Sequence, residues 1–318
     1  MPQLMLIRHA AFSTYAGPQL TSLRECSEDE IRTLLFKSPP KTCPLDPVPT
    51  DVLLQSVDIL LPFICVMCNA SLRESVLPSS QKTAIITPVV KKPGLDPDEP
   101  QYYRPISNLT FMSKIIERLV TEQIQTHLKQ CNLMPSVQSA YRKGHSTETV
   151  LVKVIADIID AADSQNVTLL GLLDMSAAFD TVDHEILLSR LETSYGISGL
   201  ALQWLRSFIT DRTQKAAFAG TCSTLTTLLY GVSQGSVLGP LLFVFLLVFL
   251  PDARNISSCD GSLFFLRFYN SSLISGLPCA FRNPSLLLCS SSSTKNRFCC
   301  LVNCLSEVFS LILHIRQL

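Results

Sequence analysis

An apolar segment that ends on a carboxylate constrains the fold of this chain more than any other feature. Residues 167–174 read VTLLGLLD, and Asp174 closes the run. A short aliphatic run without alternating polar residues is typical of a strand that is buried on both faces. A segment with helical spacing follows at 183–193. A buried strand, an acidic tip and an amphipathic helix in this order predict an α/β fold.

Three other segments have clear local patterns. A helix is predicted from Phe111, because apolar residues recur at helical spacing over about five turns, at Met112, Ile115, Ile116, Leu119, Val120, Ile124 and Leu128. Ser146 is a candidate N-cap of another helix. The β-branched run TAIITPVV at 83–90 predicts a strand, which Pro88 should place near a sheet edge. A turn-rich loop is expected over 91–105.

The segments at either end of this region are less regular. Thr50 is expected to cap a mostly buried helix over 51–72 that is interrupted at Pro62. Beyond Thr210, the runs QKAAFAG and TLTTLLY can pair as a hairpin that leads into GVSQGSVLGPLLFVFLLVFLP. The apolar run Leu241–Leu250 has 10 residues. A membrane span needs about twenty, so a core helix is favoured over a membrane segment.

Composition excludes several classes of protein. The chain has 318 residues, of which 47% are hydrophobic and 16% charged, so it is not a disordered chain, a collagen or a small disulfide knot. Lys and Arg number 26, as do Asp and Glu, so any nucleic-acid site must be a local basic patch. The first residues are too polar for a signal peptide, which predicts an intracellular protein of the nucleus or cytoplasm with reduced cysteines.

The cysteines divide the chain unevenly. Residues 1–250 hold six, and residues 251–318 hold the other six, in a segment that is rich in serine and has no clear period. Cys65 and Cys68 form a C-x-x-C, which is either half of a zinc site or two small hydrophobes on a buried helix. The absence of a second pair at zinc-finger spacing favours the hydrophobes.

Asp174 is the best catalytic candidate in the chain. A charge at the end of a buried strand is costly unless it is paired or coordinates a metal. Phosphoryl transfer by a two-metal clamp needs carboxylates that converge from rigid strands, and Asp180 and Asp183 follow nearby. Taken alone, an Asp at a strand end is more typical of an N-cap for the next helix than of a metal ligand.

Four segments taken in order resemble the successive blocks of reverse transcriptases from non-LTR retrotransposons, the jockey-like LINE elements. They are YYRPISNLTFMSKIIERLV at 102–120, QSAYRKGHSTETVL at 138–151, LLDMSAAFDTVDHEILLSRL at 172–191 and GVSQGSVLGPLLF at 231–243. The stretch LLFKSPPKTCPLDPVPTDVL resembles the segment before the polymerase, so the resemblance covers roughly residues 25–250.

The resemblance implies a right-hand polymerase with its fingers and part of its palm. An N-terminal helical segment at 1–80 would precede the fingers and partial palm at 81–250, and a divergent Ser/Cys-rich tail would follow at 251–318. It also implies an RNA template, a DNA primer and deoxynucleoside triphosphates as partners, Mg²⁺ or Mn²⁺ as cofactor, and no membrane partner.

The resemblance also assigns roles to individual residues. Asp174 matches the first catalytic carboxylate, which binds metal, and Phe179 matches the residue that blocks a ribose 2′-hydroxyl. The residues matched to nucleotide binding in the other blocks are Arg104, Arg142, Gln234 and Gly235. A guanidinium suits phosphate because its fork can donate two hydrogen bonds. Without the resemblance, these residues could be surface arginines, a core phenylalanine and a turn before a helix.

One departure from the family pattern bears on activity. The family carries Tyr-Ala-Asp-Asp after the fourth block, whereas this sequence has no Asp-Asp pair and has Tyr269-Asn270-Ser271-Ser272 at about the expected place. Neutral side chains are poor substitutes for the anionic ligands of Mg²⁺. The parent family makes DNA from RNA, but this chain is expected to be an inactive pseudoenzyme. The alternatives are an RNA-directed DNA polymerase and a non-catalytic nucleic-acid-binding remnant.

Overall fold

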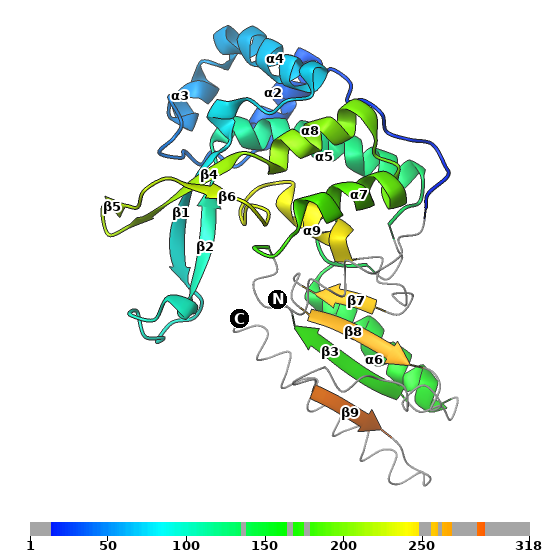
Figure 1. Ribbon diagram of the computed structural model, residues 1–318. Coiled ribbons are helices and arrows are strands. Elements are labelled where there is room, and N and C mark those ends of the chain that lie inside the picture. The colour runs from blue at the N-terminus through cyan, green and yellow to red at the C-terminus, as the bar shows by residue number, and fades with distance from the viewer. Residues whose placement is uncertain are drawn as a thin grey trace. The chain divides into compact units, whose positions relative to one another are not determined.

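The computed structural model describes residues 14–134, 138–163, 168–174, 179–247, 256–259, 263–268 and 285–289. The chain forms two compact units that each combine helices and strands (Figure 1). The first unit comprises residues 1–90, 96–134 and 179–251, and the second comprises residues 91–95, 135–178 and 252–318. The predicted mixed α/β class is confirmed.

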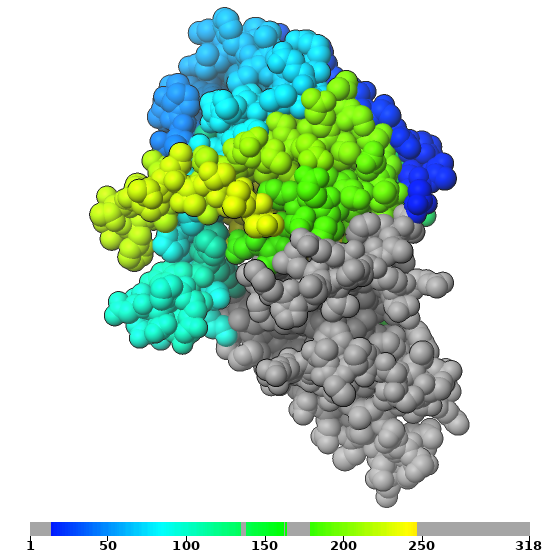
Figure 2. All heavy atoms as spheres, viewed as in Figure 1, coloured from blue at the N-terminus to red at the C-terminus, as the bar shows by residue number. Residues whose placement is uncertain are grey.

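The first unit is built on a five-stranded sheet. Its strands are β1 (Thr83–Val90), β2 (Tyr103–Asn108), β4 (Arg212–Phe218), β5 (Thr221–Cys222) and β6 (Thr226–Leu228). The strand order is β2-β1-β4-β5, and β6 also pairs with β4. The predicted hairpin beyond Thr210 is therefore confirmed, and Figure 2 shows it projecting from the first unit. β1 and β4 run parallel, which joins distant parts of the chain in one sheet.

The strand predicted at 83–90 is confirmed as β1, although it lies inside the sheet. Its pairing with β4 ends at Ile86, so Pro88 pairs only with Pro105 of β2. A proline, which lacks an N–H, is tolerated there because the other side of the strand is unpaired. The loop predicted over 91–105 was wrong at its end, because β2 begins at Tyr103.

Seven α-helices are described in the first unit. They are α2 (Glu28–Lys37), α3 (Thr50–Gln55), α4 (Val57–Glu74), α5 (Phe111–Gln130), α7 (His184–Tyr195), α8 (Gly199–Ile209) and α9 (Gly239–Leu247), with the short 3₁₀ helices η1 (Ser79–Gln81) and η2 (Pro100–Tyr102). α5 confirms the helix predicted from Phe111, and most of its apolar stripe is buried. α7 confirms the helix predicted over 183–193.

α9 is the core helix predicted from the apolar run after Gly239. The side chains of residues 241–246 are all buried, while residues 248–250 lie outside the described residues. No helix in the described part of the chain is both long and apolar enough to span a bilayer.

The helix predicted over 51–72 differs from the structure in its number of helices, its cap, its break and its burial. It is two helices, α3 and α4, and Thr50 forms no side-chain cap. The break falls at Ser56, whereas Pro62 lies within α4. The helix is also not mostly buried, since three apolar side chains on one face are exposed: Ile59 (73%), Phe63 (72%) and Val66 (70%). Apolar residues surround α4, so its sequence does not show which face packs inward.

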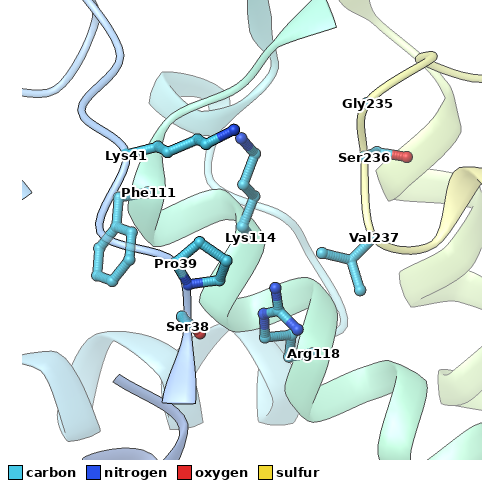
Figure 3. A pocket seen from close by; sticks show the side chains of 9 residues that line it. All are labelled: Ser38, Pro39, Lys41, Phe111, Lys114, Arg118, Gly235, Ser236 and Val237. Atoms are coloured by element: carbon cyan, nitrogen blue, oxygen red, sulfur yellow. The ribbon is translucent and has the colours of Figure 1, made fainter. Parts of the chain in front are cut away.

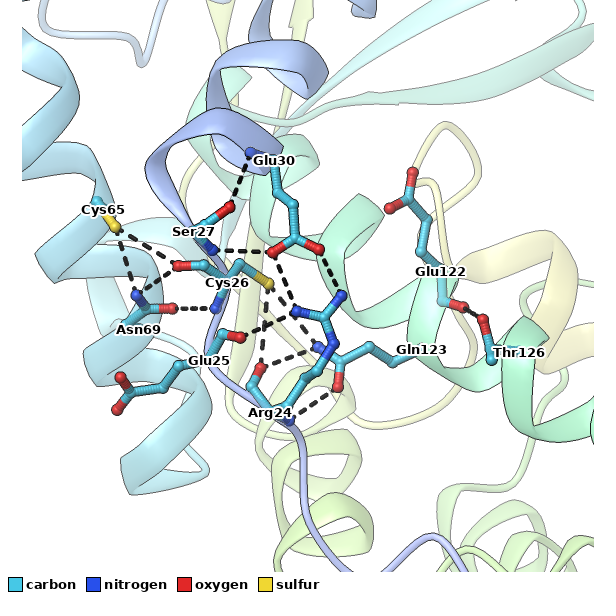
Figure 4. Close-up of polar contacts among 10 residues, drawn as sticks. All are labelled: Arg24, Glu25, Cys26, Ser27, Glu30, Cys65, Asn69, Glu122, Gln123 and Thr126. Carbon is cyan, nitrogen blue, oxygen red and sulfur yellow. Dashed lines mark hydrogen bonds and ion pairs between the residues drawn. The ribbon is translucent and has the colours of Figure 1, made fainter.

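A capping box starts α2 and is drawn in Figure 4. Ser27 Oγ accepts the Glu30 N–H at 3.2 Å, and the Glu30 carboxylate accepts the Ser27 N–H at 2.9 Å. Arg24 donates to both oxygens of this carboxylate, at 3.0 and 2.5 Å. Arg24 and the Ser27 N–H together lower the pKa of Glu30 to about 2. The start of α2 is therefore held by local polar contacts.

Cys65 and Cys68 lie on α4, and both are free thiols. Cys68 is fully buried, and burial raises its pKa to about 12. Burial also raises the pKa of the neighbouring Cys26 to about 11. A buried neutral thiol behaves as a small hydrophobic side chain. Cys68 packs as a small hydrophobic residue, as the second interpretation of the C-x-x-C proposed.

The second unit contains a four-stranded sheet and one described helix. Its elements are α6 (Thr147–Asp163), β3 (Thr168–Asp174), β7 (Ile256–Cys259), β8 (Leu263–Phe268) and β9 (Ser285–Cys289). β3 confirms the strand predicted at 167–174 and lies between β8 and β9, antiparallel to both. Ser146 caps α6 as predicted, since its Oγ accepts the Thr149 N–H at 3.3 Å. The division into segments 1–80, 81–250 and 251–318 stays a prediction.

The buried stripe of α5 should dominate the stability of the first unit. We expect Ile116→Ala to lower the free energy of unfolding by about 2–5 kcal/mol, because it leaves a cavity at a fully buried site. Ile59→Ala removes the same atoms from a side chain that is 73% exposed. It should change the free energy of unfolding by less than about 0.5 kcal/mol. Urea unfolding followed by circular dichroism measures both; equal losses would contradict this packing.

Candidate functional site

The Gln234–Gly235 turn lies directly against strand β2. The Ser107 N–H donates to the Gln234 carbonyl at 2.7 Å. Gly235 has φ +119°, and a Cβ there would lie 2.6 Å from the Ser107 carbonyl oxygen. Only glycine can adopt this conformation so close to another backbone. The turn is therefore packed on the strand that also carries Arg104.

A buried carboxylate holds the loop that follows this turn. Glu117 on α5 is fully buried, and its Oε2 accepts the N–H groups of Val237 at 2.6 Å and Leu238 at 3.1 Å. Its other oxygen accepts the Ser113 hydroxyl at 3.1 Å. The two N–H groups stand just before α9, where the helix dipole also favours negative charge. Glu117 thus connects α5 to the start of α9.

The buried guanidinium of Arg212 attracts the Glu117 carboxylate electrostatically. Burial raises the pKa of Glu117, and the attraction of Arg212 opposes that shift. Burial likewise lowers the pKa of Arg212, opposed by Glu117. The Arg212 guanidinium donates to the Phe208 carbonyl at 3.0 Å and lies 5.0 Å from the centre of the Phe208 ring. Each buried charge offsets part of the other's desolvation cost.

Phe179 packs on the segment that contains the Gln234–Gly235 turn. Its ring stacks on Phe243 of α9, with ring centroids 5.1 Å apart and an interplanar angle of 27°. The Val232 N–H donates to the Phe179 carbonyl at 2.8 Å. Gly231 has φ +88°, and a Cβ there would lie 2.8 Å from the same carbonyl oxygen. These contacts bring Phe179 together with the turn region, while its role against a 2′-hydroxyl stays a prediction.

Two of the predicted site residues belong to the second unit. Asp174 is the last residue of β3, and its backbone is in register with Leu263 of β8. Arg142 lies in the turn before α6, and its Nη1 donates to the Gln138 carbonyl at 3.2 Å. The predicted site residues of the first unit are Arg104, Phe179, Gln234 and Gly235. The catalytic and nucleotide-binding roles of all six residues stay predictions.

The carboxylates that follow Asp174 in the sequence, Asp180 and Asp183, have local environments of their own. Asp183 caps α7, because its Oδ1 accepts the N–H groups of Glu185 at 3.0 Å and Ile186 at 3.1 Å. Asp174 is therefore not the cap of this helix. Burial raises the pKa of Asp180. Across the described ranges no three His, Cys, Asp or Glu side chains gather as a metal site.

Residues 269–272, where the family pattern places Tyr-Ala-Asp-Asp, lie outside the described residues.

The structure also reveals residues to which the sequence patterns assigned no role. Glu117 replaces an apolar residue within the buried stripe of α5, and a charge in such a stripe is a signal of a buried polar contact. Lys114 and Arg118 are four residues apart on the same helix, which places them on one face. With Lys41 they line a pocket of about 340 Å³ beside Gly235 (Figure 3).

Glu117 should be the most sensitive polar residue of this site. We expect Glu117→Ala to lower the free energy of unfolding by roughly 3–5 kcal/mol, because it leaves two buried N–H groups without acceptors and Arg212 without its counter-charge. Glu122→Ala, at an exposed position of the same helix, is the matched control. Chemical denaturation of both variants tests this, and a loss no greater than that of the control would refute it.

Comparison with known proteins gives the family. Residues 90–265 match the family model described as "Reverse transcriptase (RNA-dependent DNA polymerase)". The matched segment contains every residue assigned a role above by the family resemblance.

Three curated relatives come from fruit flies. The chain is 32% identical over 181 residues to "Probable RNA-directed DNA polymerase from transposon BS" of Drosophila melanogaster, covering 57% of this chain and 20% of the relative. It is 35% identical over 181 residues to "Probable RNA-directed DNA polymerase from transposon X-element" of the same species, with the same coverage. It is 30% identical over 238 residues to "RNA-directed DNA polymerase from mobile element jockey" of Drosophila funebris, covering 73% of this chain and 25% of the relative.

The chain thus spans a fifth to a quarter of the length of these relatives. The family model matches more than half of the chain. The chain belongs to the reverse transcriptase family and is of the non-LTR retrotransposon type.

Proposed function

We propose that this chain is a reverse transcriptase domain that does not polymerise DNA and that retains nucleic-acid binding. The observation that carries the proposal is the absence of an Asp-Asp pair from all 318 residues, in a chain that otherwise keeps four family blocks in order. Polymerisation depends on carboxylates that hold divalent ions, whereas binding depends on basic groups and packed backbone. Losing the first does not remove the second.

The right-hand polymerase assignment places nucleic-acid binding and metal binding on different elements. Strands β1 and β2 are assigned to the fingers, and β3 with Asp174 to the palm. The tight packing of Gly235 on Ser107 supports a preserved surface for a nascent base pair, because the backbone approach survives without any metal. On this proposal Gln234 and Gly235 line that pair, and Phe179 borders the sugar.

The partners follow from the chemistry and from the relatives. The printed names of the relatives describe RNA-directed DNA polymerases. We therefore assign an RNA template and a DNA primer as partners of this chain, with deoxynucleoside triphosphates as weaker ligands. Arg104 and Arg142 would contact phosphate oxygens, for which a guanidinium offers two parallel N–H donors.

Mg²⁺ is the cofactor expected of the family, with Mn²⁺ as a substitute. Asp174 is the one matched ligand in this chain. A single carboxylate cannot hold two divalent ions about 4 Å apart against their mutual repulsion. The proposed function therefore does not include retention of the metal pair.

The competing function is RNA-directed DNA synthesis by this chain. The order of the four blocks and the names of the relatives favour it. It requires the missing anionic ligands to come from elsewhere, with Asp180, Asp183 and Asp260 as the candidates. Of these, Asp183 already accepts two backbone N–H groups as a helix cap, which weighs against it.

Primer extension separates the two functions. We expect the purified chain to extend no primer on an RNA template with Mg²⁺ or Mn²⁺, because its metal ligands are incomplete. Asp174→Asn should therefore give the same background signal as the unmodified chain. Template-dependent incorporation that disappears in Asp174→Asn would overturn the proposal and establish the polymerase function.

Binding is the second test. We expect weak, sequence-independent binding of RNA whose affinity falls steeply with salt, because phosphate contacts release counterions. Arg142→Ala should weaken binding about tenfold, as expected for one charge-assisted contact. Lys153→Ala is the control, because it removes an equal charge from an exposed residue of α6 that is paired with Asp157. Anisotropy of a labelled RNA measures both, and equal affinities in the two variants would refute the role of Arg142.

A further inference from the structure

A basic pocket lies between α5 and the loop that follows the Gln234–Gly235 turn. Its volume is about 340 Å³, and its lining includes Lys41, Lys114, Arg118 and residues 235–237. Three cations and no carboxylate line it. No role has been assigned above to any of these cations, since they lie outside the residues matched to metal or nucleotide binding.

The three cations come together from two separate segments. Lys114 and Arg118 lie one turn apart on α5, and Lys41 comes from the loop after α2. Figure 3 shows the side chains of Lys41 and Lys114 extending toward one another. Within the described part of the chain, neither lysine forms an ion pair. Like charges that converge without a counter-ion repel, and a bound anion relieves that repulsion.

Arg118 adds a donor without an acceptor. Its Nε is buried and has no hydrogen-bond partner among the described residues. Buried donors are nearly always hydrogen-bonded, and those that are not often indicate an absent ligand or ion. An oxyanion in the pocket would provide the acceptor that this N–H lacks.

Two carboxylates beside the pocket, Asp46 and Glu117, are hydrogen-bonded to backbone N–H groups. Asp46 Oδ1 accepts the Phe111 N–H at 2.8 Å, and its Oδ2 accepts the Cys43 N–H at 2.6 Å. Glu117 is directed to the N–H groups of Val237 and Leu238. Both carboxylates lie outside the lining, which includes Lys41, Lys114 and Arg118.

We propose that this pocket binds a phosphoryl group. Arg118 would donate through Nε, and the two lysines would neutralise the phosphate as point charges. The proposal rests on the proposed nucleic-acid binding, because Gly235 and Ser236 place the pocket next to the turn assigned to the nascent base pair. The phosphoryl group can come from a nucleic-acid backbone or from a free polyphosphate, and the experiment separates these sources.

The experiment compares the full chain with one triple variant, Lys41→Gln/Lys114→Gln/Arg118→Gln. Its control is Lys129→Gln, at an exposed position near the end of the same helix. Two probes are used: a labelled single-stranded RNA and inorganic tripolyphosphate. Unfolding midpoints are measured for each variant to show that it folds. Arg118→Lys is added because it keeps the positive charge but loses the forked guanidinium donor.

The triple variant should lose about tenfold or more of RNA affinity, and its salt slope should fall by about 0.7, because one phosphate contact on a single strand contributes about that much. Lys129→Gln should match the unmodified chain. Arg118→Lys should keep the slope and lose only part of the affinity. Competition by tripolyphosphate at the same site would identify a free polyphosphate as a source, and its failure to compete would assign the pocket to the backbone.

Two outcomes separate the pocket from the wider function. The first outcome has two parts: Arg142→Ala loses RNA binding, and the folded triple variant binds both RNA and tripolyphosphate as the unmodified chain does. This result would overturn the pocket proposal and leave the proposed function standing. If the chain binds tripolyphosphate through the three cations but binds no RNA, the pocket stands and the proposed function fails.

Discussion

The fully buried carboxylate of Glu117 organises the first unit. It is directed to the two N–H groups before α9 and interacts electrostatically with Arg212 at the start of β4. Three parts of the chain that are far apart in sequence therefore meet around one charge. A buried charge is tolerated only when hydrogen bonds and a counter-charge surround it, so each partner constrains the others. The same loop brings Gly235 so close to Ser107 that a Cβ at Gly235 would lie 2.6 Å from the Ser107 carbonyl oxygen.

The sequence predicted those elements whose patterns are local. The apolar stripe of α5 and the aliphatic run of β3 each stand out against polar neighbours, and both were found at nearly their true bounds. α4 was mispredicted, because it is apolar around much of its circumference and its inward face depends on what packs against it. The position of β1 inside its sheet could not be predicted either, since its pairing with β4 depends on tertiary contact.

The residues of the candidate site could be predicted only from the four ordered blocks. The residues that surround these blocks in the fold could not be predicted from the sequence. Gly235 matched a block, but the reason for a glycine appears only when Ser107 lies 2.6 Å from its missing side chain. Lys41 could not be linked to Lys114 and Arg118 by spacing, because the loop after α2 and helix α5 meet only in the fold. Motifs therefore identify the chemistry of such a domain, while its electrostatic surroundings depend on the tertiary fold.

The parallel pairing of β1 with β4 has a consequence for biosynthesis. Thr83 and Thr213 bond to each other across 130 residues of sequence. The ribosome adds roughly 5–20 residues per second, so β4 is synthesised on the order of ten seconds after β1. The edge of β1 that pairs with β4 has no partner strand until then. During that interval the edge is an unpaired template for association with other chains. A transposon copy interrupted between these two strands would leave that edge open permanently, so such products are candidates for removal by cellular quality control.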